Sequence, residues 1–275
     1  MATPQHERAR RFREMHARER AFVLPNPWDA GSARMLEALG FEALATTSSG
    51  FANSLARLDG EVTLDETLAH CRALCAATDV PITADLENGF GADPERAAAT
   101  VVAAAAAGVV GGSIEDYSGD PAAPIYDLAH AVERIHAAAE AAHGLDLPFT
   151  LTARAESFLQ GRRDLDDTIR RLQAFEEAGA DVLYAPGLTT LEEVREVCQA
   201  VSRPVNVLAP MIRGATLDEL EAAGARRLSV GGALARAALG GMLRAAEELR
   251  EGGFGWVAEI APGAEVAKLL ARPGT

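Results

Sequence analysis

One repeated pattern constrains the fold of this chain more than any other feature. A short apolar run ends in small or acidic residues, a loop and a helical stretch follow, and a glycine precedes the next run. Strands that alternate with helices indicate parallel βαβ units. The pattern predicts eight strands, over residues 22–24, 43–46, 82–84, 112–114, 149–152, 182–184, 205–208 and 227–230.

Eight such units in 275 residues match the size of a (β/α)8 barrel, which takes about 250 residues. We expect one barrel domain over residues 1–275, with an N-terminal helix within residues 1–20 and a C-terminal helical tail over residues 252–275. An open, doubly wound sheet is the alternative. It fits less well because Pro25 to Asp29 follow the first strand, where that fold carries a glycine-rich dinucleotide motif.

Local signals for helix ends agree with this interpretation. The spacing of a capping box, a threonine three residues before a glutamate, occurs at Thr63, Thr190 and Thr216. A glycine, which readily adopts the left-handed conformation of a helix C-terminus, closes four helical stretches at Gly40, Gly108, Gly179 and Gly224.

The charge balance limits the partners of the chain. Lys and Arg number 26 against 40 Asp and Glu, for a net charge of −14, which argues against nucleic acid and anionic membrane surfaces. The uncharged run over residues 97–114 is long enough to raise the question of a membrane span. Asp93 and Pro94 open it as a helix start, so we expect a helix followed by a buried strand. The N-terminal segment lacks the apolar core of a secretory signal, and we expect a cytoplasmic protein.

Several kinds of catalytic side chain are scarce. Lys268 is the one lysine of the sequence, which argues against Schiff-base and pyridoxal phosphate chemistry. Cys71, Cys75 and Cys198 fall in helical stretches, so neither a disulfide framework nor a thiol nucleophile is expected. Half a metal site at Cys71 and Cys75 is the alternative. The histidines also lie in the N-terminal segment or in helical stretches.

Acidic side chains gather where neighbouring strands end. Asp59 follows the second predicted strand, Asp85 and Glu87 the third, and Glu115 the fourth. Barrel enzymes build their sites at these strand ends. Converging carboxylates raise one another's pKa unless a cation compensates them, and ligands that are all oxygen suit Mg²⁺ or Mn²⁺. Helix capping or exposure to solvent is the alternative role for these acids.

Other polar residues at the strand ends complete a candidate site. Arg154 follows the fifth strand and is expected to stabilise a developing negative oxygen, or else to pair with the acids. The backbone around Ser48, Ser49 and Gly50 offers N–H groups to a small anion. Tyr117 is a candidate proton carrier, with simple packing as the alternative.

In order along the chain, four segments resemble the isocitrate lyase/phosphoenolpyruvate mutase superfamily. They are residues 46–50 (TTSSG), 84–91 (ADLENGFG), 113–116 (SIED) and 152–156 (TARAE). The resemblance implies a (β/α)8 barrel whose eighth helix is exchanged between subunits, in dimers that pair into tetramers.

The resemblance also implies roles for individual residues. Mg²⁺ would be held at Asp85, with Asp59, Glu87 and Glu115 acting largely through water. A 2-oxo or 2-hydroxy carboxylate would chelate the metal near Ser49 and Gly50, and Arg154 would face its developing enolate oxygen. Asn206 would contact the far end of the substrate. The catalytic candidates are therefore Arg154, Glu115 and Tyr117.

One loop departs from the family pattern. The lyases carry a Lys-Lys-Cys-Gly-His segment after the fourth strand, and the mutases and phosphonopyruvate hydrolases place Lys and Asn there, whereas residues 117–124 read YSGDPAAP. The predicted function is Mg²⁺-dependent cleavage of a C–C bond in a small 2-oxo (di)carboxylic acid, through a metal-stabilised enolate. The alternatives are a phosphonomutase or phosphonopyruvate hydrolase, which acts on a P–C bond, and a non-catalytic protein that binds 2-oxo acids.

Overall fold

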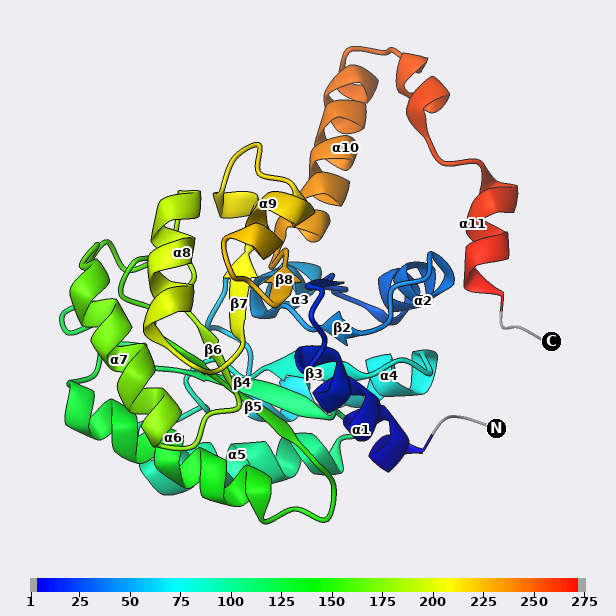
Figure 1. Ribbon diagram of the computed structural model, residues 1–275. Coiled ribbons are helices and arrows are strands. Elements are labelled where there is room, and N and C mark those ends of the chain that lie inside the picture. The colour runs from blue at the N-terminus through cyan, green and yellow to red at the C-terminus, as the bar shows by residue number, and fades with distance from the viewer. Residues whose placement is uncertain (1–3, 272–275) are drawn as a thin grey trace.

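The computed structural model describes residues 4–271 and shows eight parallel strands in a nearly closed barrel surrounded by helices (Figure 1). The predicted (β/α)8 barrel is confirmed, and the doubly wound alternative is wrong. The strands are β1 (Phe22–Leu24), β2 (Leu44–Ala45), β3 (Ile82–Asp85), β4 (Gly111–Glu115), β5 (Thr150–Arg154), β6 (Val182–Tyr184), β7 (Val205–Leu208) and β8 (Arg227–Ser229).

The strands follow one another around the ring in the order β1-β8-β7-β6-β5-β4-β3-β2. The first and last strands in this order, β1 and β2, approach each other at their C-terminal ends, where the Ala45 N–H donates to the Pro25 carbonyl at 3.1 Å. Because all strands are parallel, their C-terminal ends meet on one face of the barrel. This is the face on which barrel enzymes build their sites.

Three strands reach further toward the site than the sequence pattern predicts, and the first of them is β3, which extends to Asp85. β4 extends to Glu115 and β5 to Arg154, and these two residues are partners in the register of the ladder. The backbones of both candidate site residues are therefore fixed by the sheet rather than by mobile loops.

Helices connect the strands and cover the outside of the barrel (Figure 1). They are α1 (Gln5–His16), α2 (Ala30–Ala38), α3 (Ser48–Ser54), α4 (Leu64–Ala77), α5 (Pro94–Ala106), α6 (Leu128–His143), α7 (Leu165–Glu177), α8 (Leu191–Ala200), α9 (Leu217–Ala222), α10 (Ala233–Arg250) and α11 (Gly263–Leu270), with 3-10 turns η1 (Ala209–Met211) and η2 (Gly255–Glu259). The predicted capping boxes open α4, α8 and α9. The four predicted glycines have φ values from +92° to +108°.

The uncharged run over residues 97–114 divides between α5 and β4, as predicted. Over residues 4–271, every helix is too short or too polar to cross a bilayer.

Helix α1 closes the N-terminal end of the barrel. Its residues Ala9, Phe12 and Met15 are buried and pack against Phe22 and Leu24 of β1. The burial of these side chains holds α1 across the N-terminal end of the barrel, opposite the candidate site.

The last helices lie apart from the barrel. Helix α10 projects outward, and the chain returns through η2 to α11, which packs beside α2 (Figure 1). Of α10, Ala235 alone is buried, while Met242 and Leu243 are each 57% exposed. The predicted C-terminal helical tail contains η2 and α11, and its last residues, 272–275, lie outside the described part of the chain.

Candidate active site

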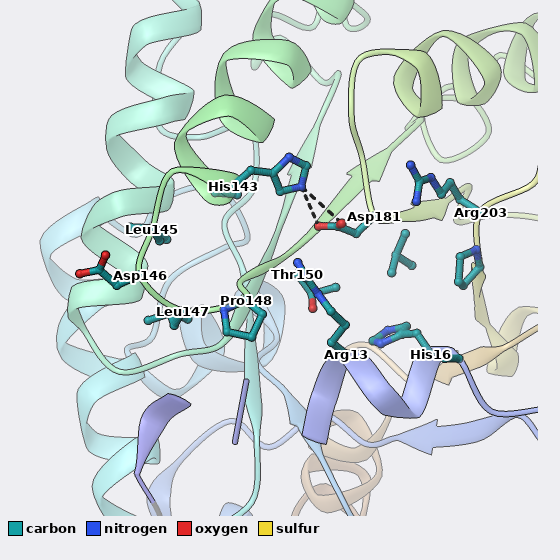
Figure 2. A pocket seen from close by; sticks show the side chains of 14 residues that line it. Arg13, His16, His143, Leu145, Asp146, Leu147, Pro148, Thr150, Asp181 and Arg203 are labelled. Atoms are coloured by element: carbon teal, nitrogen blue, oxygen red, sulfur yellow. Dashed lines mark hydrogen bonds and ion pairs between the residues drawn. The ribbon is translucent and has the colours of Figure 1, made fainter. Parts of the chain in front are cut away.

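A cavity of about 750 Å³ lies at the N-terminal ends of β5, β6 and β7 (Figure 2). Exposed Arg13 and Arg203 line it, together with His143, whose ring nitrogen is 3.4 Å from Asp181. None of the predicted site residues lines this cavity. The N-terminal face of a (β/α)8 barrel generally serves stability rather than chemistry, so we assign the reaction to the opposite face.

A pocket of about 140 Å³ opens at the C-terminal ends of the strands. Six residues of the predicted site line it: Ser48, Ser49, Asp59, Asp85, Arg154 and Asn206. Pockets for drug-sized ligands measure about 300–1,000 Å³, so this pocket suits a smaller molecule.

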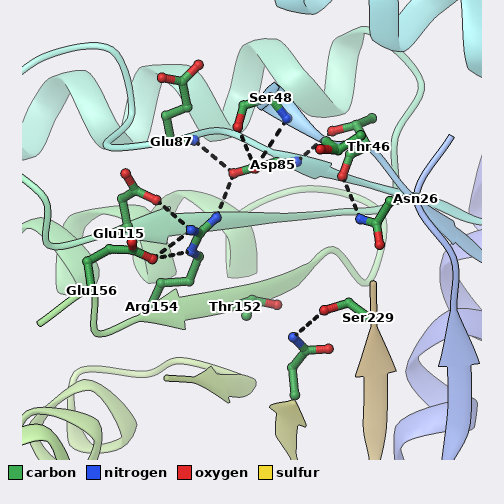
Figure 3. A network of polar contacts seen from close by, with 12 residues as sticks. Asn26, Thr46, Ser48, Asp85, Glu87, Glu115, Thr152, Arg154, Glu156 and Ser229 are labelled. Atoms are coloured by element: carbon green, nitrogen blue, oxygen red, sulfur yellow. Dashed lines mark hydrogen bonds and ion pairs between the residues drawn. The ribbon is translucent and has the colours of Figure 1, made fainter. Parts of the chain in front are cut away.

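Arg154, at the end of β5, is the centre of a buried cluster of ion pairs (Figure 3). Its guanidinium nitrogens lie 2.9 Å from Asp85 Oδ1, 3.1 Å from Glu115 Oε2 and 2.6 Å from Glu156 Oε1. Burial lowers the pKa of Arg154, but the three carboxylates raise it by more, so the guanidinium stays charged. One cation faces three acids, and negative charge is in excess.

The Asp85 carboxylate is held in one orientation by four polar contacts (Figure 3). Besides Arg154, the Ser48 hydroxyl donates to Oδ2 at 3.0 Å, and the Ser48 and Glu87 N–H groups donate to its oxygens at 3.4 and 3.3 Å. The Asp85 N–H in turn donates to Thr46 Oγ1 at 2.8 Å. The start of α3 and the end of β3 are thus joined through one carboxylate.

The loop after β3 brings Glu87 beside Glu115. Glu87 has a φ of +48°, a left-handed conformation that is strained for residues other than glycine and is enriched at functional sites. Its carbonyl accepts the Glu115 N–H at 3.0 Å, and the Leu86 N–H donates to the Ser113 carbonyl at 3.3 Å. These bonds extend the pairing of β3 and β4 and so bring the acids together.

The acids of this cluster resist ionisation. Burial, followed by the charges of Asp85 and Asp59, raises the pKa of Glu87 to about 8. Burial also raises the pKa of Glu115 well above its usual value, against the opposing effect of Arg154. Asp59, at the rim of the pocket, has a pKa raised by partial burial and by Asp85, although a hydrogen bond from Ser48 lowers it.

The donor chemistry of the cluster fits a hard divalent cation. The acids provide only oxygen atoms, and burial together with the neighbouring carboxylates raises their pKa values by more than Arg154 lowers them. Over residues 4–271, no three Asp, Glu, His or Cys side chains stand close enough to bind one ion directly. Mg²⁺ usually keeps several waters and takes one or two direct carboxylates, so the geometry suits an ion bound largely through water.

Two residues that the sequence analysis did not assign support the cluster. Glu156 bonds to Arg154, and its own N–H donates to buried Asp116 at 2.8 Å. Arg134 of α6 is fully buried and donates to the backbone carbonyls of Glu115 and Gly91 at 3.0 and 3.1 Å. Glu156 could have been found from sequence, because it lies two residues beyond Arg154. Arg134, in the middle of a helix, gives no such signal.

The remaining predicted residues have different surroundings. Ser49 lines the pocket, whereas the Gly50 N–H is used within the chain, donating to Thr47 Oγ1 at 3.3 Å to cap α3. Asn206 faces the pocket interior and donates to Ser229 Oγ at 3.0 Å. Tyr117 is not among the lining residues, and its backbone pairs with Ile125 across the loop after β4.

The three cysteines lie on helices, as predicted. Cys71 and Cys75 are on α4 and Cys198 is on α8. Burial raises the pKa of Cys71 and Cys198 to about 12 and that of Cys75 to about 11. These thiols therefore remain protonated and lack the thiolate character of a nucleophile.

Comparison with known proteins identifies the family of the chain. The family model of phosphoenolpyruvate phosphomutase matches residues 12–250. The chain belongs to this family. The resemblance to the isocitrate lyase/phosphoenolpyruvate mutase superfamily is thus confirmed, and the site described above lies within the matched range.

Three relatives illustrate the range of the family. A crystal structure of a presumed lyase/mutase from Burkholderia cenocepacia J2315 has 53% identity and a TM-score of 0.94, with 98% of this chain and 97% of that chain covered. The 2-methylisocitrate lyase of Escherichia coli K12 is 32% identical over 73% of this chain and 69% of its own. The oxaloacetate decarboxylase of Paraburkholderia xenovorans LB400 is 31% identical over 71% and 67%, respectively.

The loop that departs from the family pattern folds back on itself. The Ser118 N–H donates to the Pro124 carbonyl at 2.8 Å, the Ser118 hydroxyl donates to the Ala123 carbonyl at 2.7 Å, and the Ala122 N–H donates to Asp120 at 2.8 Å. The loop therefore forms a compact turn, and it contains no cysteine, lysine or histidine.

The acidic cluster makes the stability of the EDTA-treated protein depend on pH. The pKa of Glu87 rises from 4.5 to about 8 on folding, so the folded chain keeps a proton that the unfolded chain releases. Its contribution to stability is full below pH 4.5 and is lost as the pH rises through 8. We expect the free energy of unfolding in urea to fall over this range in wild type, and to fall less in Glu87→Gln. Equal pH slopes for the two proteins would contradict the placement of Glu87.

Proposed function

We propose that this protein is a Mg²⁺-dependent enzyme that cleaves a C–C bond in a small 2-oxo acid, by a retro-aldol or decarboxylation reaction. The observation that carries the proposal is the cluster of Arg154 with Asp85, Glu115 and Glu156 beside a pocket of about 140 Å³. The excess negative charge of the acids favours a bound cation. The Arg154 guanidinium is held in place, and the pocket beside it has room for a small ligand.

Asp85 would hold Mg²⁺ directly, and Asp59, Glu87 and Glu115 would act through water. Bound there, Mg²⁺ would supply a Lewis acid that polarises the 2-oxo group and stabilises an enolate. Mn²⁺ has similar preferences for oxygen ligands.

The residues of the chain would provide the rest of the chemistry. The Arg154 guanidinium, fixed by three carboxylates, would stabilise negative charge on the substrate oxygen without reorganising during the reaction. Ser48 and Ser49 would bind the carboxylate at the start of α3. Glu115, held at the end of β4 3.1 Å from Arg154, would be the first candidate for the acid that protonates the product carbon, with Tyr117 as a second candidate.

A P–C bond enzyme would need cations around a phosphoryl group, and residues 117–124 supply none. This composition favours C–C cleavage over the phosphonomutase and phosphonopyruvate hydrolase alternatives.

Turnover with a panel of 2-oxo acids tests the proposal. We expect oxaloacetate or a related acid to be consumed in Mg²⁺, activity to vanish with EDTA, and excess Mg²⁺ to restore it. A ³¹P signal from phosphonopyruvate turnover, in the absence of C–C cleavage, would indicate a P–C enzyme. Ligand binding without any turnover would indicate a binding protein, and both results would overturn the proposal.

We further propose that the protein is a homo-oligomer, a dimer or a pair of dimers that exchange α10. On this helix and the following segment, Met242, Leu243 and Phe254 are 57%, 57% and 69% exposed. An apolar surface of this kind usually marks an interaction site.

We expect light scattering at micromolar concentration to give the mass of a dimer or tetramer. Met242→Glu with Leu243→Glu should shift this mass toward the monomer, because charged side chains cannot be buried unpaired in an interface. The same double change to glutamate at exposed Leu39 and Val102 adds the same negative charge elsewhere on the surface and serves as the control. A monomeric wild type would contradict the proposal.

A further inference from the structure

Arg227 is a buried arginine in the barrel interior whose role the site does not yet explain. It lies on β8, is 4% exposed, and lines the pocket at the C-terminal strand ends. Its Nε–H donates to Asn206 Oδ1 at 2.9 Å, and an Nη2–H donates to Thr152 Oγ1 at 3.1 Å. Its Nη1 lies 3.5 Å from His16 Nε2.

Toward the N-terminal end of the barrel, Arg227 faces the neutral imidazole of His16 on α1. His16 Nδ1 lies 2.8 Å from the Phe12 carbonyl, which can only accept, so Nδ1 carries the proton and Nε2 turns a lone pair to Arg227. Burial, and then the charge of Arg227, lower the pKa of His16 to about 3. His16 thus contributes no charge.

Arg227 has no ion-pair partner in the described part of the chain. Among residues 4–271, burial and Tyr184 are the influences on its pKa, and no Asp or Glu side chain contributes. Burial lowers the pKa of Arg227 to about 10, which still leaves it charged at neutral pH. A buried cation without a partner is costly, so its presence in a pocket wall points to an anionic ligand.

The other cation of the pocket differs in this respect. Arg154 is surrounded by three carboxylates, whereas Arg227 contacts only neutral groups. A guanidinium has five N–H groups, and the three contacts of Arg227 leave two of them for a ligand.

We propose that Arg227 binds a second carboxylate of the substrate, from the floor of the pocket, and so selects dicarboxylic 2-oxo acids. The inference rests on the proposed function, because it assumes that the other end of the acid is held near Asp85. A planar carboxylate matches the fork of a guanidinium, and Asn206 holds that fork in place. Asn206 is on this basis a positioning residue rather than the direct contact that the family resemblance suggested.

Two ligands of equal charge test the proposal. Oxalate and 3,3-difluorooxaloacetate are both dianions, but only the second carries a carboxylate beyond the 2-oxo group. Their dissociation constants would be measured by calorimetry in Mg²⁺, for wild type and Arg227→Met. We expect the variant to bind difluorooxaloacetate about 10- to 100-fold more weakly, the effect of losing a hydrogen bond to a charged group, and to bind oxalate as wild type does.

Three controls make the result decisive. Arg203→Met removes the same charge from the opposite face of the barrel and should leave both affinities unchanged. Arg227→Gln keeps a polar side chain for the case in which Met fails to fold, and it should show the same selective loss. Thermal unfolding establishes that each variant is folded.

The outcomes separate the two proposals. An equal loss of both ligands in folded Arg227 variants, or no loss, would overturn the role of Arg227 and leave the proposed function standing. Failure of both ligands to bind wild type in Mg²⁺ would contradict the proposed function, and the role of Arg227 would fall with it.

Discussion

Replacement of Asp85 by asparagine is expected to lower the affinity for Mg²⁺ by at least about 100-fold and to abolish Mg²⁺-dependent ligand binding. Losses of 10- to 100-fold accompany changes to groups that only support a metal ligand, and Asp85 is the residue proposed to bind the ion directly. The variant keeps the shape of the side chain but loses the charge that pairs with Arg154 at 2.9 Å. Asp85→Ala should have the same effect, because it removes the oxygen proposed to bind the ion directly. It would also leave Glu87 and Glu115 to repel each other.

Calorimetry of Mg²⁺ binding to wild type and Asp85→Asn measures this effect. Asp146→Asn is a matched control, because it removes one negative charge at an exposed position beside the cavity at the other end of the barrel. An Mg²⁺ affinity in Asp85→Asn equal to that of wild type would show that the ion binds elsewhere or not at all.

Replacement of Arg154 by lysine is expected to reduce kcat by about 10²- to 10³-fold, with a smaller change in KM. Removing one group that stabilises a developing oxyanion typically costs this much. Lysine retains the positive charge, which the carboxylates at 2.6–3.1 Å require. It loses the planar fork that contacts several of them at once.

Comparison with Arg154→Met separates catalysis from stability. Methionine leaves three buried carboxylates unpaired, which should cost about 3–5 kcal/mol of folding free energy and lower Tm. We expect Arg154→Lys to keep most of the stability yet lose the activity. A lysine variant with full kcat would show that Arg154 only neutralises the acids, which is the alternative that the sequence left open.

Much of the fold follows from local sequence signals. The apolar runs of β1, β6 and β7 have the predicted bounds because they are flanked by polar or small residues that end them. Each capping threonine bonds to a residue three positions further along the chain. Each closing glycine adopts a positive φ at its own position. Signals of this range do not depend on the rest of the chain, so the sequence alone predicts eight units and therefore a barrel.

The convergence of the acids was also predictable, because the order of the strands around a (β/α)8 barrel follows their order in the chain. Asp85, Glu87 and Glu115 come from adjacent strands, so the barrel necessarily brings them to one edge. How far Arg154 offsets the negative charge of these acids was not predictable, since this depends on burial and on the distances between side chains.

Only the tertiary structure decided which groups surround each of the two buried arginines, Arg154 and Arg227. Sequence places Arg154 at a strand end, but two of its three carboxylate contacts, Asp85 and Glu115, come from other strands at distances that only packing sets. Arg227 is 73 residues from Arg154 in the chain and is the first residue of the predicted strand over residues 227–230. Its position inside the barrel, rather than outside, depends on the register of β8 with β1 and β7. A shift of one residue in that register would turn the side chain outward, so its charge enters the pocket only once the barrel has closed.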